Sequence, residues 1–276
     1  MKVTLITVCF NSAATLSTAI DSVLSQKGVD IEYIIVDGGS TDETVEIIKE
    51  YAEKTLNSQL LTPNFTFRWL SESDRGMYDA INKGIKMATG DVVGILNADD
   101  VLASDDTLAH IVSAFNTDSC ALTPDPSRVD AVYADIRFVK EGETVEAVRK
   151  AETVRYCSAK RWRPWMFRFA AMVPHPSFYV RRECFERLGG YSLDYRICAD
   201  FELELRYLYL AKLKAAYLPE CVVVMRMGGM STAGWRSNIV INREDLRALR
   251  AHGIWSCMPL IYLKYLFKIW GFVFRR

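Results

Sequence analysis

The stretch of residues 90–100, GDVVGILNADD, places two adjacent carboxylates directly after an apolar run. Residues 92–96 have the small and branched apolar character of a buried strand. Asn97, Asp99 and Asp100 follow at the end of that strand. Neighbouring carboxylates repel each other and burial disfavours their charged forms, so they need water or a partner. This cost suggests that the two carboxylates serve a function at this end of the strand.

Polar side chains also stand at the ends of the other strands that the sequence predicts. In a parallel α/β sheet the ligand site lies beyond the carboxyl ends of the strands, so these groups are expected to converge on one cleft. They are Thr7 and Asn11 after the first strand, Asp37 after the second, and Glu72, Asp74 and Arg75 after the third.

Alternating strands and helices must position these groups. Short apolar runs predict strands at residues 3–9, 32–36, 65–70 and 91–96. Apolar residues at helical spacing predict the helices between them, at residues 16–24, 45–52 and 76–88. Repeated alternation of this kind predicts an α/β fold with a mostly parallel central sheet flanked by helices. After residue 100 the pattern weakens.

Composition narrows the class of protein. The chain has 276 residues, 50% of them hydrophobic, which suits one large α/β domain with a smaller appendage. Lys plus Arg equals Asp plus Glu, 34 each, and this balance argues against a dedicated nucleic-acid binder. The seven cysteines include no CxxC pair, so we expect reduced thiols, a cytosolic protein and no zinc site. No apolar run reaches about 18 residues, so a membrane-spanning helix is not supported.

The nucleotide-binding motifs with a simple sequence signature are missing. The sequence contains neither GxGxxG after the first strand nor GxxxxGK[ST] anywhere, which argues against NAD enzymes and P-loop NTPases. Instead, TVCFN, IIVDGGSTDET and ESDRGMYDAINKGIKMATGDVVGILNADD together resemble the nucleotide-sugar half of family 2 glycosyltransferases. The resemblance is dense over residues 3–102 and continues more thinly at residues 174–203 and 226–232. It implies the GT-A fold, that of nucleotide-diphospho-sugar transferases.

The resemblance also implies how a donor and a metal are held. Asn97-Ala98-Asp99 stands at the family's Asp-x-Asp motif, which makes Asp99 the expected ligand of Mg²⁺ or Mn²⁺. Asn97 departs from the motif, and its amide is expected to bind a ribose hydroxyl or a metal-bound water. Asp100 is then available to cap the next helix. The other expected donor contacts are Thr7, Asn11, Asp37, Asp74 and Arg75.

Two readings of Asp37 stay open at this point. In the family's arrangement its carboxylate accepts a hydrogen bond from the imide N–H of a pyrimidine base. The alternative is a turn residue that precedes Gly38-Gly39.

The resemblance places the catalytic base at Asp200, where the sequence predicts the start of a helix. An inverting transfer needs one carboxylate to take the proton from the acceptor hydroxyl as that oxygen attacks the anomeric carbon. A plain N-cap role is the alternative for Asp200. Asp194 and Glu202 are the other candidates for the base.

The acceptor side of the cleft is assigned less specifically. His175 is expected near the acceptor, with a structural role as the alternative. Gly228 and Gly229 would let the backbone approach a phosphate or a sugar closely, or would form a simple turn. Residues 155–182 interleave basic and aromatic side chains, which suits a lipid headgroup surface or a diphosphate-linked acceptor.

The C-terminal segment has its own character, because no Asp or Glu follows Asp245. On a helix over residues 259–275, Lys264, Lys268 and Arg275 fall within roughly 40° of one another. Tyr262, Leu266, Ile269 and Val273 fall opposite. Such a helix would lie in a membrane interface, or alternatively would pack on the catalytic domain. We therefore expect a catalytic domain over residues 1–220, with halves at 1–102 and 103–220, and an extension over residues 221–276.

The sequence thus predicts an inverting hexosyltransferase that uses a nucleotide diphosphate sugar, most simply a UDP-sugar, and a saccharide acceptor. A polyprenyl-diphosphate-linked acceptor would place it on the inner face of the cell membrane, in the synthesis of O-antigen, capsule or exopolysaccharide. The alternatives are a sugar-phosphate nucleotidyltransferase, which would carry a Gly-rich basic loop where this chain has NSAAT, and a non-catalytic binding protein of the same fold.

Overall fold

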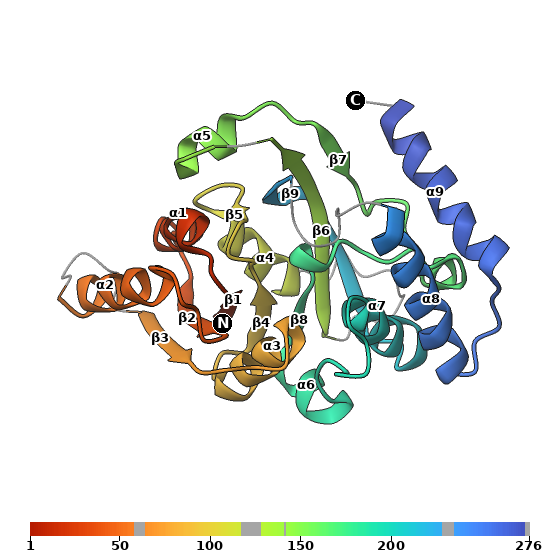
Figure 1. The fold of residues 1–276 in the computed structure, drawn as a ribbon, viewed down its shortest axis with the longest axis horizontal. Coiled ribbons are helices and arrows are strands. Elements are labelled where there is room, and N and C mark those ends of the chain that lie inside the picture. The colour runs from red at the N-terminus through yellow and green to blue at the C-terminus, as the bar shows by residue number, and fades with distance from the viewer. Residues whose placement is uncertain (58–63, 117–127, 141, 228–234, 274–276) are drawn as a thin grey trace.

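The computed structural model describes residues 1–57, 64–116, 128–140, 142–227 and 235–273. Within these ranges a nine-stranded sheet has the order β3-β2-β1-β4-β8-β6-β9-β5, and β7 pairs with β6. Helices cover the sheet, and α7, α8 and α9 lie together at its right-hand end in Figure 1.

The elements have the following bounds. The strands are β1 (Lys2–Cys9), β2 (Asp30–Asp37), β3 (Phe65–Ser71), β4 (Val92–Ile95), β5 (Val101–Leu102), β6 (Ala131–Val139), β7 (Arg155–Cys157), β8 (Tyr179–Arg181) and β9 (Ala215–Arg226). The α-helices are α1 (Ala13–Leu24), α2 (Thr44–Asn57), α3 (Met77–Met87), α4 (Thr107–Asn116), α5 (Val145–Lys150), α6 (Arg182–Leu188), α7 (Ala199–Glu204), α8 (Trp235–Ala251) and α9 (Met258–Val273). Shorter turns of helix are η2 (Pro164–Phe169), η3 (His175–Ser177) and η4 (Leu205–Leu210).

The N-terminal half has the parallel sheet that the sequence predicts. β1 pairs in parallel with β2 and with β4, and β2 pairs in parallel with β3. Because parallel strands end at the same edge, Cys9, Asp37, Ser71 and Ile95 all lie at one edge of the sheet. That edge is where a ligand site is expected in such a sheet.

The second half of the sheet is mixed in direction. β8 runs antiparallel to both β4 and β6, whereas β9 runs parallel to β6. β9 extends from Ala215 to Arg226, so the extension expected from residue 221 begins inside a strand of the central sheet. The chain that follows β9 contributes α8 and α9.

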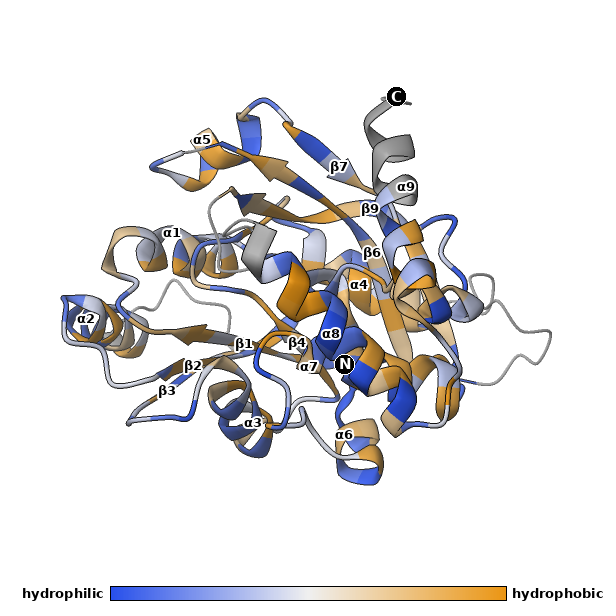
Figure 2. Cartoon of the chain, turned by 45° about the vertical axis from the view of Figure 1, so that its right-hand side comes forward, coloured by the Kyte–Doolittle hydropathy of each residue, from blue (hydrophilic) through white to orange (hydrophobic). Residues whose placement is uncertain are grey.

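Alternate residues of the central strands enter two separate cores, one on each face of the sheet. In β1, Ile6 and Val8 join the core that includes α3, whereas Leu5 and Cys9 join the core that includes α1. Since both faces are covered, the strand is apolar at almost every position, as its sequence indicates. Figure 2 shows this as orange strands at the centre of the molecule.

The C-terminal helix α9 packs on the domain, and the face it turns inward is the opposite of the one expected for a membrane helix. Lys264 points inward, is 6% exposed, and its Nζ lies 2.7 Å from Oδ2 of Asp245 on α8. Tyr262, expected on the buried side of an interfacial helix, is 50% exposed. The expectation that Lys264 presents its charge to a membrane is therefore wrong, because the buried carboxylate of Asp245 draws the ammonium group inward. Among the described residues no helix is long and apolar enough to cross a bilayer.

Candidate active site

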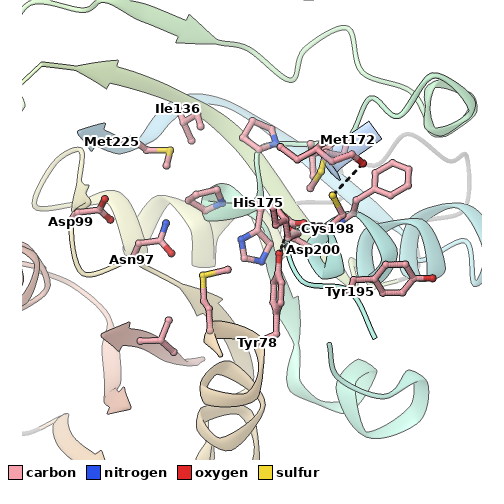
Figure 3. A pocket seen from close by; sticks show the side chains of 18 of the residues that line it. Tyr78, Asn97, Asp99, Ile136, Met172, His175, Tyr195, Cys198, Asp200 and Met225 are labelled. Atoms are coloured by element: carbon pink, nitrogen blue, oxygen red, sulfur yellow. Dashed lines mark hydrogen bonds between the residues drawn. The ribbon is translucent and has the colours of Figure 1, made fainter. Parts of the chain in front are cut away.

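A large cleft opens over the carboxyl ends of β1, β2 and β4. The donor end is formed by residues that follow these strands, and the opposite wall by residues 155–176, 193–201 and α8. Figure 3 shows Asn97 and Asp99 at one end of the cleft and Asp200, with His175 and Tyr78, at the other. Four of the sequence-predicted groups, Asn97, Asp99, His175 and Asp200, thus lie in one cleft although they come from distant parts of the chain.

The turn after β4 separates the two adjacent carboxylates. Asp99 lines the cleft, whereas Asp100 is fully buried beneath it. The Asn97 Nδ2 donates a 2.8 Å hydrogen bond to Asp100 Oδ2, and Arg226 donates a 2.6 Å bond from Nη1 to the backbone oxygen of Asp99. Burial, followed by the neighbouring charge of Asp99, holds the pKa of Asp100 well above its ordinary range. The turn therefore presents one carboxylate, Asp99, to the cleft.

The donor set at this turn fits a divalent metal held partly by its substrate. Mg²⁺ in such sites takes one or two protein carboxylates together with substrate phosphates and water. Asp99 supplies one carboxylate, and burial raises its pKa, which a bound cation would reverse. The Asp100 Oδ1 is buried without a hydrogen-bond partner in the described part of the chain. No group of three or more His, Cys, Asp or Glu residues that could hold a metal occurs within the described ranges.

Loops around the strand ends place the expected donor contacts. Asn11 lines the cleft in a left-handed conformation with φ 50°, and its Oδ1 accepts a 2.9 Å bond from the Thr41 backbone N–H. Asp74 and Arg75 also line it, just before α3. A Cβ on Gly38 would lie 2.5 Å from the Asp74 Oδ2, so a larger residue here would displace the Asp74 carboxylate.

Two expected donor residues lie below the cleft surface. Thr7 is fully buried within β1, and its Oγ1 accepts a 2.9 Å bond from the Tyr33 hydroxyl, so the expectation that Thr7 lines the pocket is wrong. Both faces of β1 are covered at Thr7, whereas the last two residues of the strand, Val8 and Cys9, line the cleft.

Asp37 is also fully buried, and its carboxylate organises the turn that follows β2. It accepts bonds from the backbone N–H groups of Gly39 and Ser40, each at 3.1 Å, and from the Ser71 hydroxyl at 2.7 Å. This is the turn role that the sequence left open. A contact between Asp37 and a pyrimidine base stays a prediction that would require the turn to open.

Asp200 lies at the start of α7, and its half-buried carboxylate faces the cleft. The Phe201 backbone N–H donates to its Oδ1 at 2.8 Å. The Tyr78 hydroxyl lies 3.2 Å from the same oxygen and also contacts the backbone oxygen of Ile197, so its single hydrogen is shared between the two acceptors. Burial raises the pKa of Asp200 to about 6, although these two hydrogen bonds act in the opposite direction. A carboxylate of this kind is ionised at neutral pH and is still basic enough to accept a proton.

His175 belongs to an aromatic cluster that supports Asp200. The His175 Nε2 lies 2.7 Å from the Tyr191 hydroxyl, and the Tyr191 ring stacks on the Tyr78 ring with centroids 5.6 Å apart. Burial lowers the pKa of His175 to about 4, so its ring is neutral at physiological pH. His175 lines the cleft, and the structure also gives it the packing role that the sequence offered as an alternative.

The other two candidates for the base differ from Asp200 in their surroundings. Glu202 points away from the cleft and is tied to the Arg206 guanidinium at 3.0 Å and to the His252 Nε2 at 2.8 Å. Its carboxylate is therefore committed to packing α7 against its neighbours. Asp194 lines the cleft but is exposed at its rim. Asp200 lies in the cleft and is half-buried, and burial raises its pKa.

Basic and aromatic residues flank the far wall of the cleft. Arg155, Lys160, Arg161 and Trp165 all line it, and Trp165 is 55% exposed. This part of the basic and aromatic stretch therefore faces the cleft rather than the outside of the molecule. Gly228 and Gly229 lie outside the described residues.

Sequence reasoning missed three residues of the cleft: Tyr78, Arg226 and Glu244. Each lies far in sequence from the group it contacts, and each contact joins different elements. No local pattern of residue types marks such contacts, since they depend on tertiary packing.

The chain has the GT-A fold. Two solved structures share the fold with a TM-score of 0.62: S. aureus TarS 1–349 in complex with UDP-GlcNAc, and the mannosyltransferase PcManGT from Pyrobaculum calidifontis in complex with GDP-Man and Mn2+. TarS is 16% identical, and the match covers 90% of this chain and 66% of that one. PcManGT is 23% identical, with 95% and 68% covered.

The family follows from the sequence comparisons. Residues 4–188 match the model of glycosyl transferase family 2, and the chain belongs to this family. A PGL/p-HBAD biosynthesis glycosyltransferase of Mycobacterium bovis is 31% identical over 241 residues, which covers 87% of this chain and 80% of that protein. An uncharacterized glycosyltransferase of Nostoc sp. is 29% identical over 230 residues, covering 83% and 66%.

Proposed function

We propose that the protein is an inverting hexosyltransferase that moves a hexose or an N-acetylhexosamine from a nucleotide diphosphate sugar, with UDP as the preferred nucleotide, to a saccharide acceptor. The observation that carries the proposal is the placement of Asp99 and Asp200 at opposite ends of one cleft. The nucleotide sugars bound to TarS and PcManGT support the class of donor.

In the proposed reaction an acceptor hydroxyl oxygen attacks the anomeric carbon as the bond from that carbon to the diphosphate oxygen breaks. The hydroxyl proton passes to Asp200. Its Oδ1 already accepts bonds from Tyr78 and Phe201, so Oδ2 is the oxygen that takes the proton. The nucleotide diphosphate leaves, and a single displacement inverts the configuration at the anomeric carbon.

Asp99 is the proposed protein ligand for Mg²⁺ or Mn²⁺ at the donor end. When bound, such an ion offsets the negative charge of the leaving diphosphate. The chain's own part is to hold Asp99 in place, through the bond from Arg226 to its backbone and the bond from Asn97 to Asp100. Asn97, Asn11, Asp74 and Arg75 are the proposed donor contacts.

The proposed acceptor is a saccharide linked to a lipid diphosphate. Arg155, Lys160 and Arg161 on the far wall supply positive charge for the diphosphate, and Trp165 offers an apolar surface beside them. Such an acceptor suits a step in bacterial surface polysaccharide synthesis at the inner face of the cell membrane.

Peripheral membrane association belongs to the same proposal, with a different surface from the one expected from the sequence. Trp255 and Tyr262 are 71% and 50% exposed near the start of α9, and aromatic side chains of this kind favour the membrane interface. The double change Trp255→Ser and Tyr262→Ser should reduce sedimentation with anionic vesicles. Leu56→Ser, at an 86% exposed site on α2, should not. Equal sedimentation of all three proteins would remove this surface from the proposal.

The function is tested by a donor screen. The protein is incubated with UDP- and GDP-sugars, Mg²⁺ or Mn²⁺ and a lipid-diphosphate saccharide, and release of nucleotide diphosphate is measured. Acceptor-dependent release with at least one donor is expected, with inverted configuration in the product. Absence of release with every donor would contradict the transferase function, and release of pyrophosphate from a nucleotide triphosphate would indicate a nucleotidyltransferase.

A further inference from the structure

Glu244, on α8, holds the segment that leads into the helix of Asp200. Its carboxylate accepts three backbone hydrogen bonds: Oε1 from the Arg196 N–H at 3.0 Å, and Oε2 from the N–H groups of Ile197 and Cys198 at 2.9 Å and 3.0 Å. These residues immediately precede α7, in which Asp200 is the second residue. A side chain from another helix thus fixes the backbone on which Asp200 stands.

The three amides need such a partner. The first N–H groups of a helix, and those of the chain entering it, have no intrahelical acceptor. Cys198 is the N-cap residue of α7, and its side chain makes no capping hydrogen bond. A charged acceptor forms stronger hydrogen bonds with N–H groups than a neutral one does. Glu244 therefore supplies, from α8, a charged acceptor for the N–H of the N-cap residue Cys198 and for the two N–H groups before it.

α8 is itself firmly anchored, which makes it a rigid support for the Glu244 side chain. Asp245 forms a buried ion pair with Lys264 of α9 at 2.7 Å. The Asn242 Oδ1 accepts a 3.2 Å bond from the Tyr265 hydroxyl, and Ala248 and Leu249 are fully buried. Movement of the Glu244 backbone would require α8 to leave these partners.

We propose that Glu244 is a positioning residue for Asp200: by binding the amides of residues 196–198 it keeps the Asp200 carboxylate at its place in the cleft. This inference rests on the proposed function, in which Asp200 takes the acceptor proton. The match to the family model ends at residue 188, so the assignment concerns a part of the chain that the match does not reach.

The negative charge of Glu244 also affects the pKa of Asp200, which gives the proposed role a second measurable effect. Burial is the first cause of the raised pKa of Asp200, and the negative charge of Glu244 adds to it. Loss of that charge should therefore lower the pKa of Asp200. The ionisable groups that act on Asp200 from the surrounding elements are Tyr78, Tyr191, Cys198, Glu204, Glu244 and Asp245.

The test uses two changes at one position. Glu244→Gln replaces one acceptor oxygen by an N–H₂ group, so it loses both a hydrogen bond and the charge. Glu244→Asp keeps the charge but shortens the side chain away from the amides. We expect kcat to fall by about 10- to 100-fold in both variants, since misplacement of a reacting group by roughly 1 Å costs that much. The KM for the donor should stay near its wild-type value, because the donor contacts lie at the other end of the cleft.

The pH profile separates the two variants. In Glu244→Gln the acid limb of kcat should move to lower pH, whereas in Glu244→Asp it should stay near that of the wild type. Hydrogen exchange of the amides of residues 196–198 should accelerate in both. Glu53→Gln, which removes an equal charge from an exposed site on α2, is the matched control and should leave kcat, pH limb and exchange unchanged.

Several results would overturn the inference. Wild-type kcat in Glu244→Asp, or unchanged exchange at residues 196–198 in both variants, would show that Glu244 does not position the segment. Complete loss of transfer in Glu244→Gln, with full activity in Asp200→Asn, would make Glu244 the base and would refute the proposed function as well. If Asp200→Asn is inactive while both Glu244 variants keep wild-type activity, Asp200 is still the base and only the role of Glu244 is refuted.

Discussion

Replacing Tyr78 by Phe should move the acid limb of the reaction to higher pH. The hydroxyl of Tyr78 lies 3.2 Å from the Asp200 Oδ1 and also contacts the backbone oxygen of Ile197, so its single hydrogen is shared between the two acceptors. Its bond to Asp200 favours the ionised carboxylate. A hydrogen bond to a charged group contributes about 1.5–3 kcal/mol, and the lower value is the upper limit for a long bond whose hydrogen is shared with Ile197. Since about 1.4 kcal/mol corresponds to one pKa unit, the pKa of Asp200 should rise by up to about one unit.

The assay for this prediction is kcat as a function of pH from about 5 to 9, with saturating donor and acceptor. The pKa of Asp200 is about 6 in the wild type. At pH 6 half of the wild-type carboxylate is therefore ionised, against about a tenth or more in Tyr78→Phe, which gives a loss of up to about five-fold. The loss should disappear near pH 8.5, where both forms are ionised.

The ring of Tyr78 stays in place in this variant, so its stacking on Tyr191 is retained. Tyr51→Phe is the control, because its hydroxyl binds Asp21 far from the cleft. An acid limb that does not move, or that moves to lower pH, would refute the reasoning that Tyr78 stabilises the charged form of the base. Glu244→Gln should move the acid limb to lower pH. Opposite shifts in the two variants would indicate that both act on the same titrating group, Asp200.

Two further predictions concern stability. Asn97→Asp should lower the free energy of unfolding in the absence of metal by about 1–3 kcal/mol, because it removes the donor to Asp100 and adds a third carboxylate. In thermal unfolding, Mn²⁺ should restore the lost stability. An unchanged melting temperature without metal would contradict the account of this turn. Lys264→Met should lower the free energy of unfolding, measured with urea, by about 3–5 kcal/mol, since it leaves Asp245 charged and buried. Adding Asp245→Asn should recover most of this loss. A double variant no more stable than Lys264→Met would show that the loss does not come from the unpaired charge.

The N-terminal half of the fold could be predicted because its strands and helices are local patterns. Covering both faces of β1 required an apolar run, and the run is visible in the sequence. The burial of Thr7 could not be predicted from this run, because a strand buried on both sides shows no alternation of apolar and polar residues that would mark an open side. After residue 100 the short strands β5, β7 and β8 depend on partners far along the chain, and no local periodicity of apolar residues predicts them.

The candidate site could be predicted only where a residue type follows a strand end or begins a helix, as for Asp99 and Asp200. The contacts that shape these two residues come from elsewhere. Tyr78 lies on α3 and Glu244 on α8, and neither differs in local sequence from an ordinary helix residue. The outward side of α9 was also mispredicted, because a helical wheel cannot show that Asp245 would be buried beneath Lys264.

The most direct test of the account is the change Asp200→Asn, measured in transfer and in donor binding. The amide can still accept hydrogen bonds from Tyr78 and Phe201 but cannot take a proton. The account predicts that the donor, with Mn²⁺, binds with a Kd close to the wild-type value, while transfer falls by about 10²- to 10⁴-fold at every pH. Transfer within a few-fold of the wild type, with the acid limb still near pH 6, would show that another group accepts the proton.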